Sequence, residues 1–270
     1  MIIDFHSHVF PDKIAKTTIS TLENMANNHA YTDGTVDGLI KVMENSGVDI
    51  SVTLPVLTKP SQFESVTKFA ISLNERFNND KKIISFGGMH PLCDNIHDKM
   101  KFLKDNGFKG VKIHPDYQGE YINHQGYIDI INSAKELDMI VVTHSGVDDG
   151  FKNQPVKCPP SLALEVIKKT NHNKFVLGHY GAHKQWQNVL EMLCDCDVFF
   201  DTAYTFYSID EKLFIDILKR HGEDKILFAT DCPWSNVKTD IERFNSFNLT
   251  ASTKEKILYK NACKLLDITY

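Results

Sequence analysis

The chain contains 270 residues, 42% of them hydrophobic and 24% charged, with a formal net charge of −5 at pH 7. These fractions are typical of a globular protein, and the negative charge argues against a general binder of nucleic acid or of acidic membranes, because such proteins usually carry a basic surface. No apolar stretch approaches the roughly 18 residues needed to cross a bilayer and no secretory leader is evident, so we expect a cytoplasmic protein with a small-molecule substrate.

Short β-branched or aromatic runs alternate along the chain with amphipathic stretches. We expect strands at residues 2–5, 50–54, 82–86, 110–113, 139–143, 174–177, 198–200 and 226–229. We expect helices at residues 36–45, 64–77, 95–105, 127–137, 162–169, 186–193, 210–220 and 239–244, and a final helix at 254–266 packed on the outside. Apolar strands that alternate with helices are typical of parallel strands buried on both faces. The pattern predicts an α/β protein, a single-domain (β/α)8 TIM barrel over residues 1–270.

Possible metal ligands follow several predicted strands at their C-terminal ends, where such barrels have their active sites. They are His6 and His8 on the first strand, His144 on the fifth, His179 on the sixth and Asp231 on the eighth. Residues two apart in a strand point to the same face, so His6 and His8 aim at one spot. Nitrogen and oxygen ligands with one position left open suit a catalytic zinc. We therefore expect one divalent metal, Zn²⁺ by preference, with a second metal as the alternative.

Two polar residues share the inward face of the fourth predicted strand, Lys112 and His114. A buried lysine is costly unless it is paired or modified. We expect an interior salt bridge between Lys112 and Asp4; a carbamylated bridging ligand and an anchor for a substrate carboxylate are the alternatives. His114 either lines the pocket or fixes the loop that begins at Pro115.

The loops after the strands would contact the substrate. The longest, residues 145–160, is either a lid that excludes water or a packed connector. Four aromatic residues near strand ends either bind the substrate or pack at the rim: Tyr117, Tyr180, Tyr204 and Trp234. All three arginines fall in predicted helices, so a substrate carboxylate would need the metal, a histidine, a lysine or an arginine from a neighbouring subunit of a homo-oligomer.

Other histidines show no convergence and are expected to be solvated: His29, His97, His124, His172, His183 and His221. The six cysteines do not form the pattern of a short secreted disulfide framework, so we expect free thiols.

Five ordered motifs resemble the amidohydrolase superfamily. They are D-F-H-S-H (4–8), G-V-K-I-H-P (110–115), V-V-T-H-S-G (141–146), V-L-G-H-Y-G (176–181) and L-F-A-T-D-C-P-W (227–234). The pattern is most similar to the amidohydrolase 2 branch, which includes the aminocarboxymuconate semialdehyde decarboxylase-like enzymes. The resemblance implies that one divalent metal is bound by His6, His8, His144 and Asp231. It also implies that His179 is a catalytic imidazole. A two-metal site would need a bridging ligand where this chain has His114.

Four functions remain open after the resemblance. The first expectation is a metal-dependent hydrolase, in which a metal-bound hydroxide attacks the carbonyl of a small amide, lactone or ester, His179 stabilises the oxyanion and Asp231 moves a proton. A non-oxidative decarboxylase on the same scaffold is the alternative. A TatD-like metal-dependent deoxyribonuclease would be expected to supply a glutamate at the end of the fourth strand and more basic loops. A non-catalytic barrel would be favoured by loss of a ligand, and none is missing.

Overall fold

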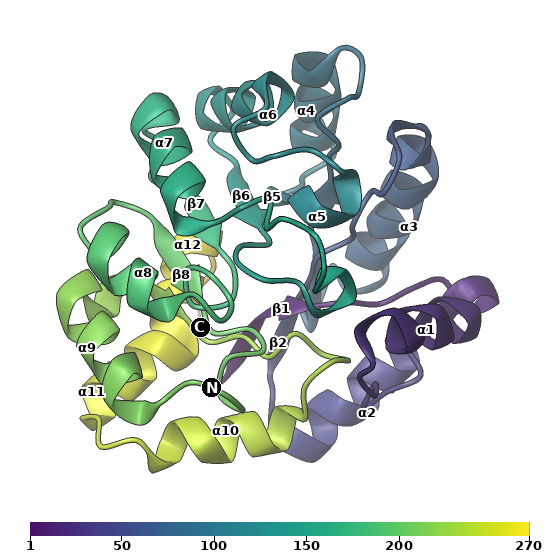
Figure 1. The fold of residues 1–270 in the computed structure, drawn as a ribbon. Helices are drawn as coiled ribbons and strands as arrows, with labels where there is room; N and C mark the ends of the chain where they lie inside the picture. The colour runs from purple at the N-terminus through teal and green to yellow at the C-terminus, as the bar shows by residue number, and fades with distance from the viewer. Residues whose placement is uncertain (270) are drawn as a thin grey trace.

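The computed structural model describes residues 1–269, in which a ring of parallel strands is surrounded by helices (Figure 1). The strands are β1 (Ile3–Ser7), β2 (Ile50–Thr53), β3 (Ile83–Ser85), β4 (Gly87–Gly88), β5 (Gly110–Ile113), β6 (Ile140–Thr143), β7 (Phe175–Leu177), β8 (Phe199–Asp201) and β9 (Ile226–Leu227). They pair in chain order, β1 to β3 in one sheet and β4 to β9 in the other.

The two sheets form one closed barrel, because only Phe86 separates β3 from β4 and backbone hydrogen bonds close the opposite side. Phe86, between β3 and β4, donates its N–H to the carbonyl of Thr53 at 2.9 Å. On the opposite side, Phe5 donates to the carbonyl of Phe228 at 2.9 Å, and Asp231 donates to the carbonyl of His6 at 2.8 Å. Each expected strand is present in the described residues, with the third divided at Phe86 into β3 and β4. The predicted TIM barrel is confirmed.

The helices lie around the outside of the ring (Figure 1). They are α1 (Asp12–Ala26), α2 (Val36–Ser46), α3 (Phe63–Arg76), α4 (Ile96–Asp105), α5 (Pro115–Gln118), α6 (Gln125–Glu136), α7 (Pro160–Thr170), α8 (Trp186–Met192), α9 (Glu211–His221), α10 (Val237–Ser246), α11 (Ala251–Glu255) and α12 (Asn261–Leu266). Short 3₁₀ turns are η1 (Pro60–Gln62), η2 (Asp149–Phe151) and η3 (Glu223–Lys225), and a π-helical turn, η4 (Lys256–Lys260), joins α11 to α12. Within residues 1–269, no helix has the length and apolar character needed to span a membrane.

Helix α9 shows how local sequence produces these elements. The carboxylate of Asp210 accepts a hydrogen bond from the N–H of Leu213 at 3.1 Å, which satisfies a free donor of the first turn. Phe214, Ile217 and Leu218 recur at the spacing of one helix face, and all three are buried. The helix ends before Gly222, whose φ of 96° suits glycine. The apolar face of α9 therefore packs on the barrel.

Helix α1 is absent from the predicted helices, although its amphipathic pattern is as strong as that of α3, α6 and α7, which were predicted. Only Ala15 and Ile19 are buried within its 15 residues. The helix contacts η2 rather than a long stretch of strand, and the ammonium of Lys152 donates to the carbonyl of Ala26 at 3.4 Å. Helix α1 therefore forms a wall at one side of the barrel mouth (Figure 1).

Two apolar clusters hold the barrel together. One fills the space between strands and helices and includes Val111 and Val141. The other includes Val142 and Val176, which are register partners on neighbouring strands and so share the inner face, and it also contains Leu266 of α12. The alternation within β6 matches a sheet that is covered on both sides.

A buried carboxyl on α10 makes stability depend on pH. Asp240 accepts a hydrogen bond from the hydroxyl of Ser235, and burial raises the pKa of Asp240 from 3.8 to about 7. The folded protein therefore holds this proton more tightly than the unfolded chain, so stability is lost as the pH rises from about 4 to about 7.

We expect Asp240→Asn to have a higher free energy of unfolding than wild type. This gain should be about 2 kcal/mol larger at pH 8 than at pH 5. Urea unfolding at both pH values measures this difference. Glu242→Gln, at an exposed position of the same helix, is the control and should show no such change. An equal effect of Asp240→Asn at both pH values would contradict the prediction.

Candidate metal centre

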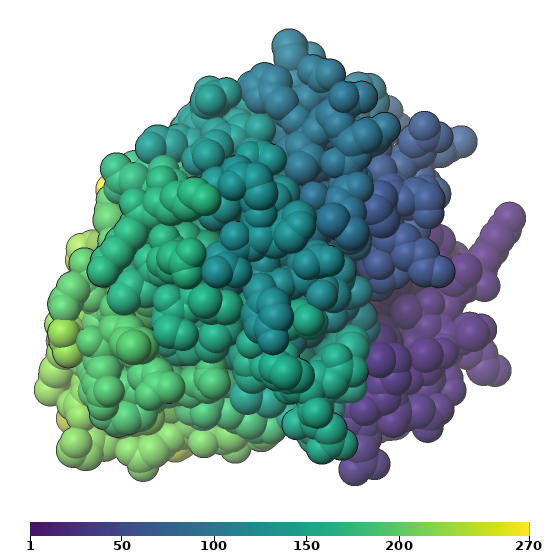
Figure 2. Space-filling view, turned by 45° about the horizontal axis from the view of Figure 1, so that its top comes forward, coloured from purple at the N-terminus to yellow at the C-terminus, as the bar shows by residue number. Residues whose placement is uncertain are grey.

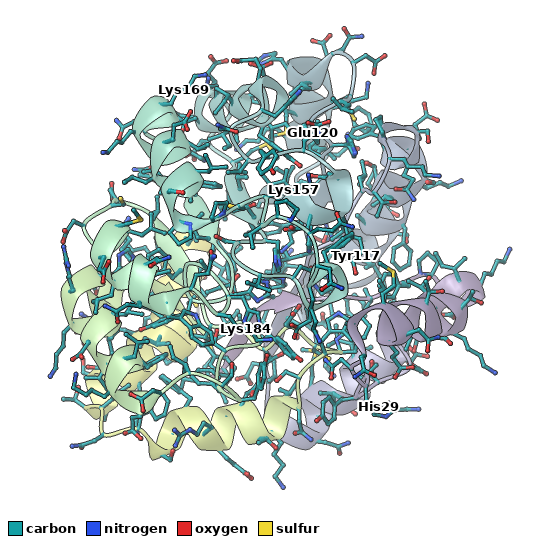
Figure 3. The ribbon with its side chains drawn as sticks, viewed as in Figure 1. His29, Tyr117, Glu120, Lys157, Lys169 and Lys184 are labelled. Carbon is teal, nitrogen blue, oxygen red and sulfur yellow. The ribbon has the colours of Figure 1, made fainter. Side chains whose placement is uncertain are left out.

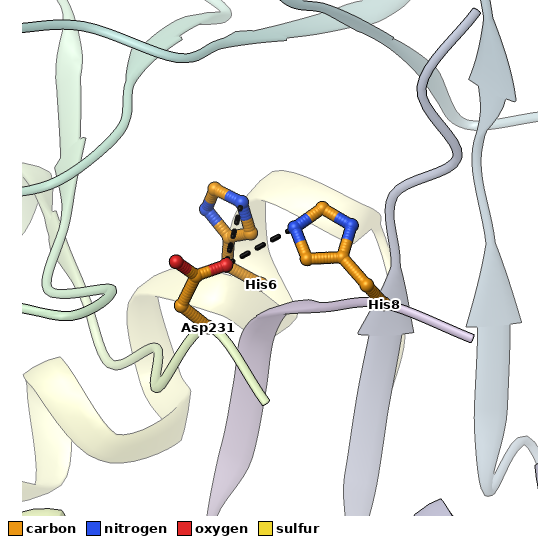
Figure 4. Close-up of side chains that lie close together, drawn as sticks. All are labelled: His6, His8 and Asp231. Carbon is orange, nitrogen blue, oxygen red and sulfur yellow. Dashed lines mark ion pairs between the residues drawn. The ribbon is translucent and has the colours of Figure 1, made fainter. Parts of the chain in front are cut away.

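Three side chains converge at the C-terminal ends of neighbouring strands (Figure 4). His6 and His8 come from the end of β1, and Asp231 lies in the segment after β9. The Nε2 atoms of His8 and His6 lie 3.1 Å and 3.6 Å from Asp231 Oδ1. One ligand atom from each residue falls within 4.8 Å of the other two. This compact set of two imidazoles and one carboxylate, hereafter the His6–His8–Asp231 triad, suits a divalent cation.

Hydrogen bonds on the far side of each imidazole direct the metal-binding nitrogen inward. His8 Nδ1 donates to the carbonyl of Leu54 at 2.8 Å, so its neutral ring carries the free lone pair on Nε2. His6 Nδ1 lies 2.9 Å from the carboxylate of the fully buried Asp201. Partners of this kind are the usual support for histidines that bind metals. The residues present therefore fit a metal ion.

Asp201 is a site residue that was not among the ligands expected from the sequence. It lies at the C-terminal end of β8. Burial alone would raise the pKa of Asp201, but the charge and hydrogen bond of His6 outweigh burial and hold that pKa below its ordinary value. The other carboxylate oxygen accepts the backbone N–H groups of His179 and Ala203. One ionised carboxylate therefore orients His6 and fixes the turn that carries His179.

We expect Asp201→Asn to weaken metal binding about 10- to 100-fold, because an amide N–H facing His6 would favour the wrong ring tautomer. Competition with a chelator of known affinity measures the change. Asp197→Asn is the matched control, because Asp197 precedes β8 and is largely exposed in a surface ion pair with Lys225. Unchanged metal affinity in Asp201→Asn would remove Asp201 from the site.

His179 brings an unpartnered nitrogen next to the triad. Its Nδ1 donates to the carbonyl of Ala203 at 3.0 Å, while its buried Nε2 has no hydrogen-bond partner among the described residues. Its ring centre lies 5.3 Å from that of His6 and 4.5 Å from that of His144. Burial, reinforced by the neighbouring histidines, lowers the pKa of His179 well below its usual range. A neutral imidazole is therefore available to accept a proton or to bind a cation.

The backbone at two site residues adopts the left-handed region that non-glycine residues rarely enter. The φ angle is 60° at His179 and 68° at Asp231. Surrounding bonds hold the first of these: the N–H of His179 donates to Asp201, and its carbonyl accepts the indole N–H of Trp186 at 3.0 Å. Such backbone conformations cluster at functional sites, which supports a role for both residues.

The structure does not gather the expected four-ligand set into one cluster. His144 lies instead with His114 and Asp148 in a second group of possible ligands. The rings of His114 and His144 stack at 4.3 Å and 12°. His144 Nε2 is 3.9 Å from Asp148 and 4.0 Å from Asp116, and it makes no hydrogen bond within residues 1–269. Metal binding by His144 together with the triad thus stays a prediction.

The expected salt bridge between Lys112 and Asp4 is wrong. Lys112 Nζ lies 2.9 Å from His6 Nε2 instead, and burial lowers the pKa of Lys112 to about 8. Asp4 accepts hydrogen bonds from the hydroxyl and the N–H of Thr230, at 2.6 Å and 3.0 Å. The carboxylate of Asp4 is thus already satisfied by the neighbouring chain segment. Lys112 also does not line the cavity described next, so a direct contact with substrate is not supported.

A cavity of about 480 Å³ opens above the triad. Of the expected substrate-binding residues, His114, Tyr117, Tyr204 and Trp234 line it. In Figure 3, Tyr117 lies near the middle of the barrel mouth, whereas Lys169 lies on the outside of α7. Tyr180 packs instead of lining the cavity: its ring is fully buried and stacks on Phe214 at 4.5 Å, and its hydroxyl donates to the carbonyl of that residue.

Two further residues line the cavity, His183 and Asp148, and neither was expected from the sequence to bind substrate. His183 was expected to be solvated, but it is buried and lines the cavity, with Nε2 3.2 Å from the hydroxyl of Tyr207. Asp148 belongs to the 145–160 segment, and burial raises the pKa of this carboxyl to about 7. His172 is also buried rather than solvated, but it does not line the cavity.

Comparisons with known proteins agree with this fold. Residues 88–268 match the family model described as Amidohydrolase. The matched range does not include the segment that contains His6 and His8. None of the curated proteins matches the sequence.

Several solved structures share the architecture along the whole chain. An uncharacterised TIM-barrel protein from Bordetella bronchiseptica has a TM-score of 0.79 and 15% identity, with 98% of each chain covered. A dihydroxybenzoic acid decarboxylase from a Polaromonas species, with bound manganese, has a TM-score of 0.72 and 15% identity over 98% of this chain and 96% of that one. A 5-carboxyvanillate decarboxylase from Novosphingobium aromaticivorans, complexed with manganese, has a TM-score of 0.72 and 14% identity over 99% and 96%. These identities indicate a shared fold.

Proposed function

Because this chain belongs to the amidohydrolase family, we propose that it is a metal-dependent enzyme that removes carbon dioxide from a small aromatic or conjugated carboxylic acid. One observation favours decarboxylation over hydrolysis. The chain resembles, along its full length, decarboxylases that act on hydroxylated benzoic acids or bind analogues of them. The cavity agrees with a flat substrate, because Tyr117, Tyr204 and Trp234 lie around the triad.

A single divalent cation is proposed at the triad. The nitrogen and oxygen donors suit zinc, which we expected first, and manganese equally, which two of the similar structures contain. The cation would supply the positive charge that binds the substrate carboxylate and withdraws electrons from the reacting carbon. This charge is needed because none of the described residues that line the cavity is lysine or arginine.

The side chains of the site divide the remaining tasks. His6, His8 and Asp231 would bind the cation, and Asp201 and the Leu54 carbonyl hold the two imidazole rings in place. In the reaction the bond from the substrate carbon to its carboxylate breaks, carbon dioxide leaves, and the carbon gains one proton. Asp231 faces the cavity and is placed to deliver that proton. The neutral Nε2 of His179 can accept a hydrogen bond from a substrate hydroxyl.

Hydrolysis of an amide, lactone or ester is the second candidate, because the same triad and cavity would serve it and the family includes hydrolases by name. A panel of hydroxybenzoates labelled with ¹³C in the carboxyl group separates the two reactions. We expect release of labelled carbon dioxide by the metal-reconstituted protein and none after metal removal. Cleavage of esters or lactones, with no release of label from any acid of the panel, would favour hydrolysis and overturn the proposal.

A further inference from the structure

One face of helix α1 is apolar but lies open to the cavity. Four residues spaced four apart, and therefore on one side of the helix, line the cavity: Ile14, Thr18, Leu22 and Ala26. Ala15 and Ile19, on another side, are buried against the protein. Ile14 remains 50% exposed. Helix α1 thus presents two faces, one packed and one left for an occupant of the cavity.

Helix α3 presents a second apolar surface to the same cavity. Val66 and Phe69 line it and are only partly buried, whereas Ala70 and Leu73 on the same helix are buried in the core. Figure 2 shows the purple segment that contains α1 beside the blue segment that contains α3, and the cavity extends between them. Apolar surface left in contact with water is the usual sign of a binding site.

The charged residues that line the cavity are all acidic. They are Asp148 and Asp149 in the segment after β6, which contacts α1 through η2, and Asp231 after β9. None of the lining residues contributed by α1 and α3 is charged, and no lysine or arginine lines the cavity in the described part of the chain. An anionic group between these helices would find no positively charged partner among the lining residues.

We propose that this apolar arm, formed by Phe10, Ile14, Leu22, Ala26, Val66 and Phe69, binds an uncharged hydrocarbon substituent of the substrate. The inference rests on the proposed function and narrows its substrate class: an alkyl- or aryl-substituted acid with its only carboxylate at the triad. The arm is continuous with the triad in one cavity of about 480 Å³, within the size of pockets that bind small organic molecules. A polyanionic acid does not fit this distribution of charge.

The experiment measures binding of benzoate and of 4-methyl-, 4-ethyl-, 4-butyl- and 4-hexylbenzoate to metal-reconstituted protein by titration calorimetry. We expect the affinity to rise about threefold to fourfold for each methylene until the arm is filled, because each buried methylene contributes by its transfer from water. An affinity that stays constant along the series would overturn the inference.

Two variants locate the effect on α3. Val66→Asp should reduce the affinity ratio of 4-hexylbenzoate to benzoate to near one. Val66→Thr, of similar shape, should give an intermediate ratio and guards against misfolding of the aspartate variant. Ser72→Asp, at an exposed position of the same helix outside the cavity, is the control and should keep the wild-type ratio. An unchanged affinity ratio in both Val66 variants would show that the hydrocarbon chain does not bind against α3.

The same titrations separate this inference from the proposed function. If benzoate binding requires the metal but affinity does not rise with chain length, the proposed function is supported and the hydrocarbon-binding role of the arm is overturned. A gain from longer chains that persists without metal would support the arm and count against a carboxylate held at the triad. Absence of binding by every compound would overturn both.

Discussion

Asp231→Asn is expected to lower turnover about 10³- to 10⁴-fold while leaving the fold intact. Asp231 Oδ1 is the point on which the Nε2 atoms of His6 and His8 converge, and it faces the cavity. Asparagine keeps the size of the side chain but cannot bind a proton and return it. Asparagine also tolerates the left-handed backbone, with φ of 68°, better than most residues.

The measurement is the rate of release of the labelled carboxyl carbon, with metal content and melting temperature determined on the same sample. Asp224→Asn is the control, since Asp224 lies just before β9 but is 72% exposed and pairs with Lys256. Near-normal turnover in Asp231→Asn, with metal retained, would exclude the role in proton transfer. Normal turnover in the control is required for the comparison.

His8→Ala is expected to remove most of the metal, with occupancy falling at least about tenfold, because one of three clustered ligands is lost. His8 is a better choice than His6 for this test. His6 is fully buried and lies within hydrogen-bond distance of both Asp201 and Lys112, so its removal would take one partner from each of two buried charged groups. The side chain of His8 is 12% exposed, and its outer partner is a backbone carbonyl.

The control for this variant is His29→Ala, because the imidazole of His29 is 87% exposed and lies outside the cavity. Elemental analysis of both proteins, after reconstitution and removal of free metal, gives the answer. Full occupancy in His8→Ala with the fold intact would show that His8 is not a ligand.

The barrel could be predicted from sequence because its strands are short apolar runs buried on both faces, and because eight strand–helix units are the number of a (β/α)8 barrel. The relative positions of His6, His8 and Asp231 followed from the same rule, since the C-terminal ends of parallel strands meet at one side of the barrel. Helix α1 was missed although its sequence is amphipathic; only Ala15 and Ile19 are buried in it, and another face lines the cavity.

Side-chain partners were harder to predict than strand positions. A salt bridge between Lys112 and Asp4 was expected because both residues were assigned to the inner face of the barrel. The hydrogen bond that Thr230 donates to Asp4 depends instead on the close approach of β1 to the segment after β9. Tyr180 follows a site histidine, yet the left-handed backbone at both residues turns its ring into the core against Phe214. Backbone conformations of this kind leave no clear signal in a single sequence.

The number of metal ions per chain tests the central claim most directly. Protein reconstituted separately with zinc and manganese, and freed of excess metal, should contain about one ion per chain that depends on the His6–His8–Asp231 triad. Protein that retains no ion of either metal would contradict the account. About two ions, falling to one in His114→Ala, would also contradict it, and would assign the second ion to His114, His144 and Asp148.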